Sequence, residues 1–188
     1  MSRLISSAVN YVKDNVQRKI KDDSIVIDAT LGNGYDTLFL RKLLSEEGFL
    51  YGFDIQEKAI ETTKNRLIEN NCDTCVQLIH DGHENLGKYI NEPVDIILYN
   101  LGYLPKGNKA ITTESHTTLK SVKAGMTLLK KGGAIFITVY PGHPAGAVEL
   151  KELLSFLEAV NQKKYEVMKV EFFNHKNNPP VVWIIERR

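Results

Sequence analysis

The strongest constraint on the fold of this chain is a regular alternation of short apolar runs with helical patterns. The apolar runs, which we expect to be strands, cover residues 24–30, 48–55, 75–81, 94–102 and 134–140. The helical patterns cover residues 4–19, 36–44, 57–71, 83–90, 116–133 and 145–161. Strands that are apolar throughout and separated by helices are typical of a parallel sheet with helices on both faces. Two last strands, 165–173 and 180–187, are joined by too few residues for a helical crossover, so we expect them to pair antiparallel.

Composition and length narrow the class of protein. The chain has 188 residues, of which 43% are hydrophobic and 25% charged, and this fits one globular domain, residues 1–188. No apolar run reaches the length of a membrane span, and the N-terminal residues show helical spacing rather than a signal peptide, so we expect a cytoplasmic protein without a membrane partner. The formal net charge of +1 means that any contact with nucleic acid depends on local lysines. Cys72 and Cys75 lack a second ligand pair, so we expect no metal site.

The loop after the first strand, "DATLGNG", predicts the class of cofactor. A dinucleotide fingerprint requires a third glycine where Thr37 stands, whereas the pattern fits D/E-x-G-x-G-x-G with Thr30 in place of the first glycine. A carboxylate at Asp28 would repel a pyrophosphate but suits the ammonium and sulfonium groups of S-adenosylmethionine (SAM). Gly32 and Gly34 let the backbone approach a ligand closely, although a glycine pair is also compatible with a simple tight turn.

Acidic residues at the ends of the next two strands support the same cofactor. Asp54 ends the second strand, where a carboxylate can accept hydrogen bonds from both ribose hydroxyls. Asp81 ends the third strand, where it can accept from the adenine amino group, and Gly82 or His83 can line the base. Each acid can equally be a helix N-cap. The predicted cofactor-binding residues are Asp28, Thr30, Gly32, Asn33, Gly34, Asp36, Thr37, Asp54, Gln56, Asp81, Gly82, His83 and Asn100.

The ends of the fourth and fifth strands predict the site of the methyl acceptor. Methyltransferases that modify exocyclic amines carry an N/D-P-P-Y/F motif here, and this chain has "NLGY", which matches at Asn100 and Tyr103. The Asn100 carbonyl can orient an amine, and Tyr103 can stack on a base. Tyr140 and His143 face the same edge, and His143 is either a general base or a residue without chemical function at the start of a helix. These four are the predicted catalytic residues.

A further set of residues is expected to contact the substrate. Thr112, Thr113 and Ser115 precede or open a helix whose N-terminus can bind a phosphate. Asn177 and Asn178 lie in the turn between the last two strands and are either substrate ligands or turn residues. The predicted substrate-binding residues are Tyr103, Pro105, Lys106, Thr112, Thr113, Ser115, Asn177 and Asn178.

Taken in order, "DATLGNGYDT", "GFDIQ", "DGHENL", "YNLGYLPKGNK", "TVYPGHPAG" and "NNPP" resemble the small bacterial family known as putative rRNA methylase. The resemblance covers nearly the whole chain. It implies an α/β, Rossmann-like class I methyltransferase fold, with a seven-stranded, mostly parallel sheet, an antiparallel last strand and helices on both faces. It implies SAM as the methyl donor.

The same resemblance implies a substrate. Members of the family are understood to methylate the amine of 5-aminomethyl-2-thiouridine at the wobble position of tRNA, so the implied partner is the tRNA anticodon stem-loop. A homodimer stays open. The alternatives are a methyltransferase of rRNA, DNA, protein or a small molecule, an NAD-linked oxidoreductase, and a non-catalytic SAM- or RNA-binding module. The oxidoreductase is disfavoured by Asp28 and Thr37.

Overall fold

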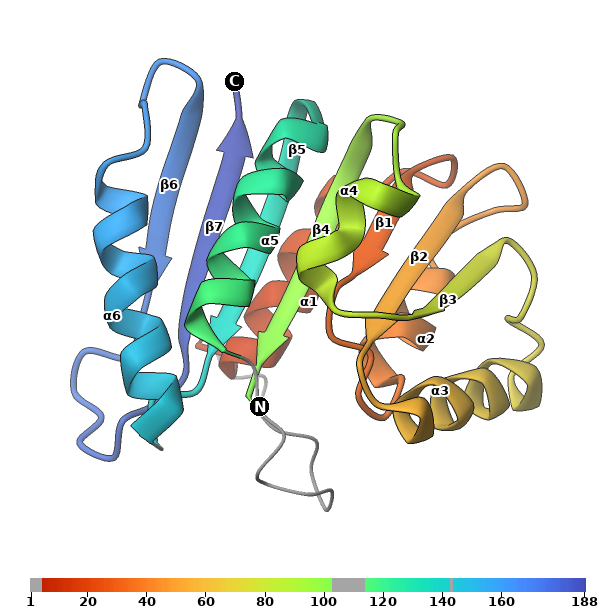
Figure 1. The fold of residues 1–188 in the computed structure, drawn as a ribbon, viewed down its shortest axis with the longest axis horizontal. Helices are drawn as coiled ribbons and strands as arrows, with labels where there is room; N and C mark the ends of the chain where they lie inside the picture. The colour runs from red at the N-terminus through yellow and green to blue at the C-terminus, as the bar shows by residue number, and fades with distance from the viewer. Residues whose placement is uncertain (1–4, 103–113, 143) are drawn as a thin grey trace.

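One seven-stranded sheet forms the centre of the molecule in the computed structural model, which describes residues 5–102, 114–142 and 144–188. Its strand order is β3-β2-β1-β4-β5-β7-β6 (Figure 1). The strands are β1 (Ile25–Asp28), β2 (Phe49–Asp54), β3 (Val76–His80), β4 (Val94–Leu101), β5 (Leu129–Val139), β6 (Tyr165–Val170) and β7 (Val181–Arg187). Strands β1 to β5 pair in parallel, and β7 runs antiparallel to both β5 and β6. The predicted sheet and its antiparallel ending are confirmed.

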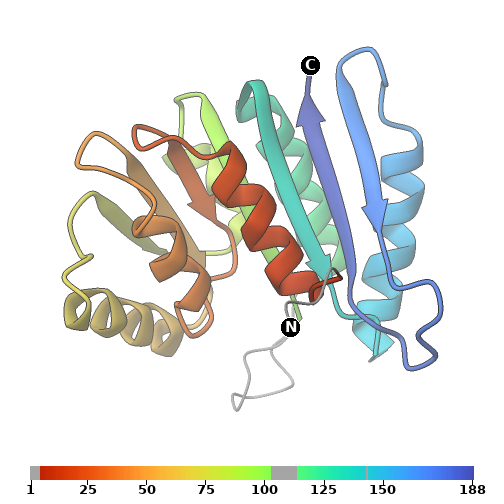
Figure 2. The ribbon, with the colours of Figure 1, turned by 180° about the vertical axis from the view of Figure 1, so that it is seen from behind.

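Helices cover both faces of this sheet. They are α1 (Ala8–Lys19), α2 (Tyr35–Arg41), α3 (Glu57–Glu69), α4 (Leu86–Tyr89), α5 (Ser115–Leu128) and α6 (Pro144–Glu158), with a 3-10 turn, η1 (His83–Asn85). Apolar residues of α4, α5 and α6 pack on one face, and those of α1 and α2 pack on the other (Figures 1 and 2). Helix α3 packs beside α2 and against β2 and β3. No helix in the part of the chain that the structure describes is long and apolar enough to cross a membrane.

The register of the parallel strands brings the predicted site residues to one edge. Asp28 ends β1 and is level with Gly52 of β2 and Leu98 of β4, and these two neighbouring strands continue for a short distance beyond that level. The carboxyl ends of the parallel strands therefore meet at the lower edge of the sheet in Figure 1. The loop between β6 and β7 lies at the same edge (Figure 1). Ligands of open α/β sheets bind at this edge.

The boundary between α5 and β5 differs from the sequence prediction. The helix ends at Leu128 and not at Gly133, and β5 already begins at Leu129. The two glycines belong to an irregular start of the strand, where the register with β4 shifts between Val94 and Ile96. Gly132 has φ +79°, and a Cβ on Gly133 would lie 2.9 Å from the Val94 carbonyl oxygen. These glycines permit an irregular, close strand pairing, whereas the sequence predicts that they end a helix.

Candidate active site

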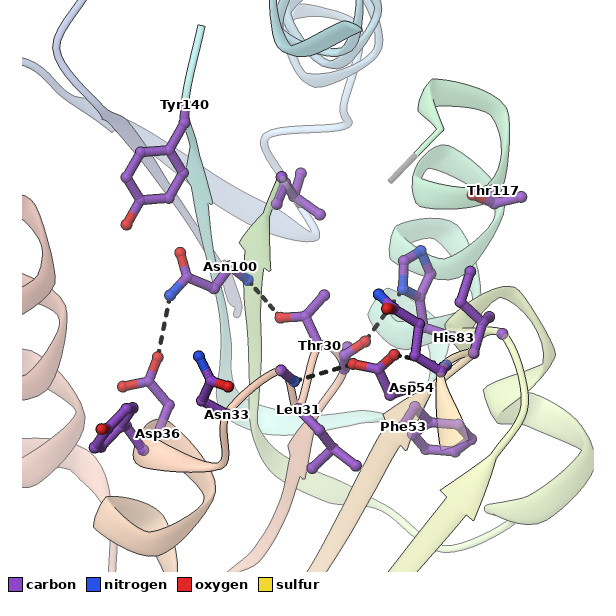
Figure 3. A pocket seen from close by; sticks show the side chains of 18 of the residues that line it. Thr30, Leu31, Asn33, Asp36, Phe53, Asp54, His83, Asn100, Thr117 and Tyr140 are labelled. Atoms are coloured by element: carbon purple, nitrogen blue, oxygen red, sulfur yellow. Dashed lines mark hydrogen bonds between the residues drawn. The ribbon is translucent and has the colours of Figure 1, made fainter. Parts of the chain in front are cut away.

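A cavity of about 840 Å³ opens at the carboxyl edge of the sheet. Its walls come from the ends of β1, β2, β4 and β5, the loop after β3, the first turns of α2 and α5, and helix α1. Figure 3 shows the side chains of the loop after β1, of β2 and of β4 turned toward one another across it. The predicted site residues that line it are Thr30, Gly32, Asn33, Asp36, Asp54, Gln56, Gly82, His83, Asn100, Tyr140 and Asn178.

The carboxyl of Asp28 lies beneath the glycine loop and supports it from below. Asp28 is buried, and its two oxygens accept hydrogen bonds from the Thr30 N–H at 3.1 Å and from the Thr37 hydroxyl at 2.7 Å. Burial, with a smaller contribution from the charge of Asp36, raises the pKa of this carboxyl to about 7, although the two hydrogen bonds oppose the shift. Asp28 and Thr37 thus hold the loop in shape from inside the protein.

The two glycines of the loop have different roles. The Gly32 N–H faces the cavity side and donates to Asp54 Oδ2 at 3.0 Å, which ties the loop to the end of β2. Gly34 has φ +73° and faces helix α3 instead, because a Cβ there would lie 2.7 Å from Thr63 Oγ1. Only glycine meets both conditions at this position without strain. Gly34 therefore sets how closely α2 and α3 approach, and Gly32 is the glycine that lines the cavity.

The loop after β3 contributes His83, whereas Asp81 has structural partners. The Asp81 carboxylate accepts hydrogen bonds from the Gly82 N–H, the Asn85 amide and the Tyr89 hydroxyl. These contacts give Asp81 a structural role in the loop, but Asp81 is not an N-cap, because the cap residues of η1 and α4 are Gly82 and Asn85.

His83 itself is buried at the cavity wall, with Nδ1 3.1 Å from the Ala29 carbonyl oxygen. A carbonyl oxygen can only accept, so the hydrogen is on Nδ1 and Nε2 keeps its lone pair. Burial lowers the pKa of the imidazole, which keeps it neutral. Among the described residues Nε2 has no hydrogen-bond partner. The ring therefore presents a fixed acceptor with an unused lone pair.

Asn100, at the end of β4, is held at two points. Its N–H donates to the Thr30 hydroxyl at 2.8 Å, and its side-chain Nδ2 donates to Asp36 Oδ2 at 3.2 Å. The other oxygen of Asp36 lies 3.1 Å from Lys13 Nζ. Since a carboxylate only accepts, the amide of Asn100 is oriented with Oδ1 away from Asp36. This oxygen is buried and has no hydrogen-bond partner among the described residues.

Tyr140 follows β5, and its hydroxyl is turned toward Asn100 Oδ1 (Figure 3). Burial raises the pKa of this hydroxyl, and the charge of Asp36 adds to the effect, while Asn100 opposes it. The phenol therefore stays protonated at neutral pH. It lies at the edge of the cavity where the predicted methyl acceptor would enter.

The lining of the cavity is predominantly acidic. Asp36, Asp54, Glu84 and Glu114 all contribute, whereas Lys13 is the one Lys or Arg among the described lining residues. Such a lining attracts cations and disfavours a phosphate or pyrophosphate. Its two buried acceptors without partners, on His83 and Asn100, call for ligands that donate hydrogen bonds.

Other predicted residues fall elsewhere. Ser115 opens α5 and Asn177 is exposed in the β6–β7 loop, and neither is among the described residues that line the cavity. The predictions for Tyr103, Pro105, Lys106, Thr112, Thr113 and His143 lie outside the residues that the structure describes.

Sequence reasoning also missed several lining residues. Glu84 and Glu114 directly adjoin predicted positions, so a wider window around the motifs would have included them. Val9 and Lys13 belong to α1, which carries no motif, and their place at the cavity depends on how α1 packs against the sheet. Tyr35 follows the glycine loop, and the Arg66 guanidinium lies over its ring, 3.8 Å from the ring centre.

Comparisons with known proteins agree with this geometry. The family described as "Putative rRNA methylase" matches residues 50–186. A crystal structure of a putative rRNA-methylase from Clostridium thermocellum superposes with a TM-score of 0.97 at 41% identity, covering 99% of this chain and 100% of that one. A putative methyltransferase from Streptococcus mutans, solved in complex with S-adenosylhomocysteine (SAH), superposes with a TM-score of 0.90 at 35% identity, covering 98% and 100%.

One relative has a name that specifies a reaction. It is the chloroplastic tRNA (mnm5s2U34)-methyltransferase of Arabidopsis thaliana, 36% identical over 181 residues, which are 91% of this chain and 66% of the relative. The chain thus spans slightly less than two thirds of that protein's length.

The fold and the site define a class I methyltransferase. The chain belongs to the putative rRNA methylase family, as its motifs predicted. The SAH in the Streptococcus mutans structure confirms the predicted cofactor class for the family.

Proposed function

We propose that this protein transfers a methyl group from SAM to a primary amine of RNA, namely the 5-aminomethyl group of 2-thiouridine at the wobble position of tRNA. The product is 5-methylaminomethyl-2-thiouridine. The observation that carries the proposal is the buried Oδ1 of Asn100, which Asp36 keeps on the side of the Tyr140 hydroxyl at the end of β4. The 36% identity to the Arabidopsis tRNA enzyme supports this choice of nucleoside.

The residues of the cavity fit SAM in charge and in hydrogen bonding. Asp54 lies at the end of β2 with Oδ1 and Oδ2 already bound to the backbone N–H groups of Gln56 and Gly32, which fixes the carboxylate where it can accept from ribose hydroxyls. The free Nε2 of His83 suits a donor such as the adenine amino group. The acidic lining suits the ammonium and sulfonium charges. When bound, SAM would supply an activated methyl group, since attack on its sulfonium methyl releases a neutral thioether, which is a good leaving group.

The role of Asn100 is to orient the nucleophile. A primary amine that donates one N–H to Asn100 Oδ1 has its lone pair fixed in direction, and correct orientation supplies much of the rate in a bimolecular transfer. The neutral Tyr140 hydroxyl, beside the same oxygen, limits the room around the amine. A substrate aminomethyl group is largely protonated in water, and the acidic lining attracts it in that form. It must then lose a proton before transfer, and His143 stays our candidate base.

The proposal is tested by mass spectrometry of tRNA nucleosides from a strain that lacks the gene. We expect 5-aminomethyl-2-thiouridine to accumulate and its methylated form to disappear. The wild-type gene should restore the methylated nucleoside, and a gene carrying Asn100→Ala should not. If the methylated nucleoside were unchanged in the deletion strain, the assignment of the wobble amine would be wrong.

A further inference from the structure

Asp36 and Lys13 form an ion pair next to Asn100. Lys13 comes from α1 and Asp36 from α2, and their charged groups are 3.1 Å apart. The second oxygen of Asp36 accepts from Asn100 Nδ2 at 3.2 Å (Figure 3). Both oxygens of Asp36 are therefore already engaged by protein groups. The sequence predicts Asp36 as a cofactor ligand, and this arrangement points to a further role for it.

We propose that Asp36, held by Lys13, is a positioning residue that orients the amide of Asn100 and requires asparagine rather than aspartate at position 100. The inference rests on the proposed function, because it explains how the acceptor for the amine is oriented. An isolated asparagine side chain can turn its oxygen or its nitrogen toward the cavity with similar ease. The Asp36 carboxylate removes this freedom, since it can only accept and therefore keeps Nδ2 on its own side.

The same contact explains the choice of residue at position 100. An aspartate there would place a second carboxylate about 3 Å from Asp36, and like charges at this distance oppose each other. Lys13 is 29% exposed and Asp36 24% exposed, so their pair is partly screened by water. The role of Lys13 is therefore to keep Asp36 in place, and its removal should have a smaller effect than removal of Asp36.

The inference makes a specific prediction for a reciprocal exchange. Asp36→Asn leaves one acceptor oxygen for two donors, Lys13 and Asn100, and should lower kcat at least tenfold. Asn100→Asp should lower it at least as much because of the repulsion. The combined variant, Asp36→Asn with Asn100→Asp, restores one amide facing one carboxylate and again leaves a carboxyl oxygen toward the cavity. We expect its kcat to exceed that of both single variants by about tenfold.

Matched controls separate positioning from damage to the fold. Lys13→Met should lower kcat several-fold, and Lys13→Arg should retain most of it. Lys19→Met is the control, because Lys19 lies on the same helix and makes an ion pair of the same length, 3.1 Å, with the remote Glu186. It should leave kcat unchanged. In all variants at positions 13 and 36 the Kd for SAM, measured by calorimetry, should stay within about threefold of the wild type.

Two measurements test whether Asp36 positions Asn100. kcat is measured with an anticodon stem-loop that carries 5-aminomethyl-2-thiouridine, and the free energy of unfolding is measured in urea without any substrate. The exchange should recover both kcat and the stability lost in the single variants. A combined variant no better than the worse single variant in either readout would overturn the inference. If the wild type did not methylate this RNA, the proposed function would fail, and the unfolding data alone would still decide whether Asp36 and Asn100 are coupled.

Discussion

At the scale of single residues, the buried carboxyl of Asp28, beneath the cofactor loop, makes the stability of the protein depend on pH. Its pKa is about 7 in the folded protein, well above the usual value of 3.8, so the folded state holds the proton more tightly than the unfolded state. The contribution of this group to stability is therefore fully present below about pH 4 and is lost as pH rises through 7. A shift of this size corresponds to on the order of 4 kcal/mol.

This sign predicts the behaviour of Asp28→Asn. The asparagine cannot ionise, so the free energy of unfolding of the variant relative to the wild type should improve by about 2–3 kcal/mol between pH 5 and pH 8. Urea unfolding of both proteins at several pH values measures the difference. A difference that is constant across this range would show that Asp28 does not titrate there.

The second residue-scale prediction concerns Asn100→Ala. Because Asn100 Oδ1 lies away from Asp36 and is the oxygen that we propose orients the amine, its loss should lower kcat by about a hundredfold. The Kd for SAM should change by less than about threefold. Single-turnover kinetics and calorimetry measure the two quantities. The reverse pattern, with weak SAM binding and normal transfer, would place Asn100 in the cofactor site instead.

At the scale of elements, the turn from β1 into α2 depends on one glycine. Gly34 combines φ +73° with a close approach to Thr63 on α3. Gly34→Ala should cost about 1–2 kcal/mol for the left-handed conformation alone, and more because its methyl group would meet Thr63. Gly132→Ala is a matched control, since Gly132 has φ +79° and nothing within 4 Å of its would-be Cβ.

The comparison of the two glycine variants isolates the packing effect. Gly34→Ala should be more destabilising than Gly132→Ala in urea unfolding and should also weaken SAM binding, while Gly132→Ala should leave SAM binding unchanged. Equal losses of stability at the two positions would mean that α3 moves away without cost and that the close approach is unimportant.

Most of the strands and helices could be predicted from the sequence, because the spacing of apolar residues indicates which residues are buried. The apolar runs "VIDA" and "DIILY" indicated buried parallel strands, and the short link "NHKNNPP" indicated an antiparallel end. The start of β5 could not be found in this way. A glycine pair after a helical pattern also describes a helix end, and its use against the backbone of β4 is a tertiary contact.

The residues of the site also divide into those that the sequence predicts and those that it does not. Asp54, Asn100 and the glycine loop were predicted because strand ends of a parallel sheet converge. Lys13 was not, because an isolated lysine on a helix face carries no signal before the packing of α1 is known. Asp81 and His83 were both singled out, but the sequence could not tell which has its hydrogen-bonding capacity filled by its neighbours.

At the scale of the whole molecule, we expect a near-neutral protein with an acidic cavity to bind the proposed RNA substrate through few phosphate contacts. The formal net charge is +1, and the described lining of the cavity is mainly acidic. Each phosphate of a single strand that is neutralised adds about −0.7 to the slope of log affinity against log salt concentration. We expect RNA binding to weaken with salt, with a slope no steeper than about −3. Fluorescence anisotropy of a labelled stem-loop measures it, and a much steeper slope would indicate an extended basic surface.

The most direct test of the account is methyl transfer in vitro from labelled SAM to two anticodon stem-loops that differ at the wobble position. One carries 5-aminomethyl-2-thiouridine and the other carries uridine. The account predicts one methyl group on the first RNA, located on the side-chain amine by mass spectrometry, and none on the second. Equal methylation of both RNAs, or a methyl group on a base or ribose atom, would contradict the role of Asn100 as the acceptor for an amine.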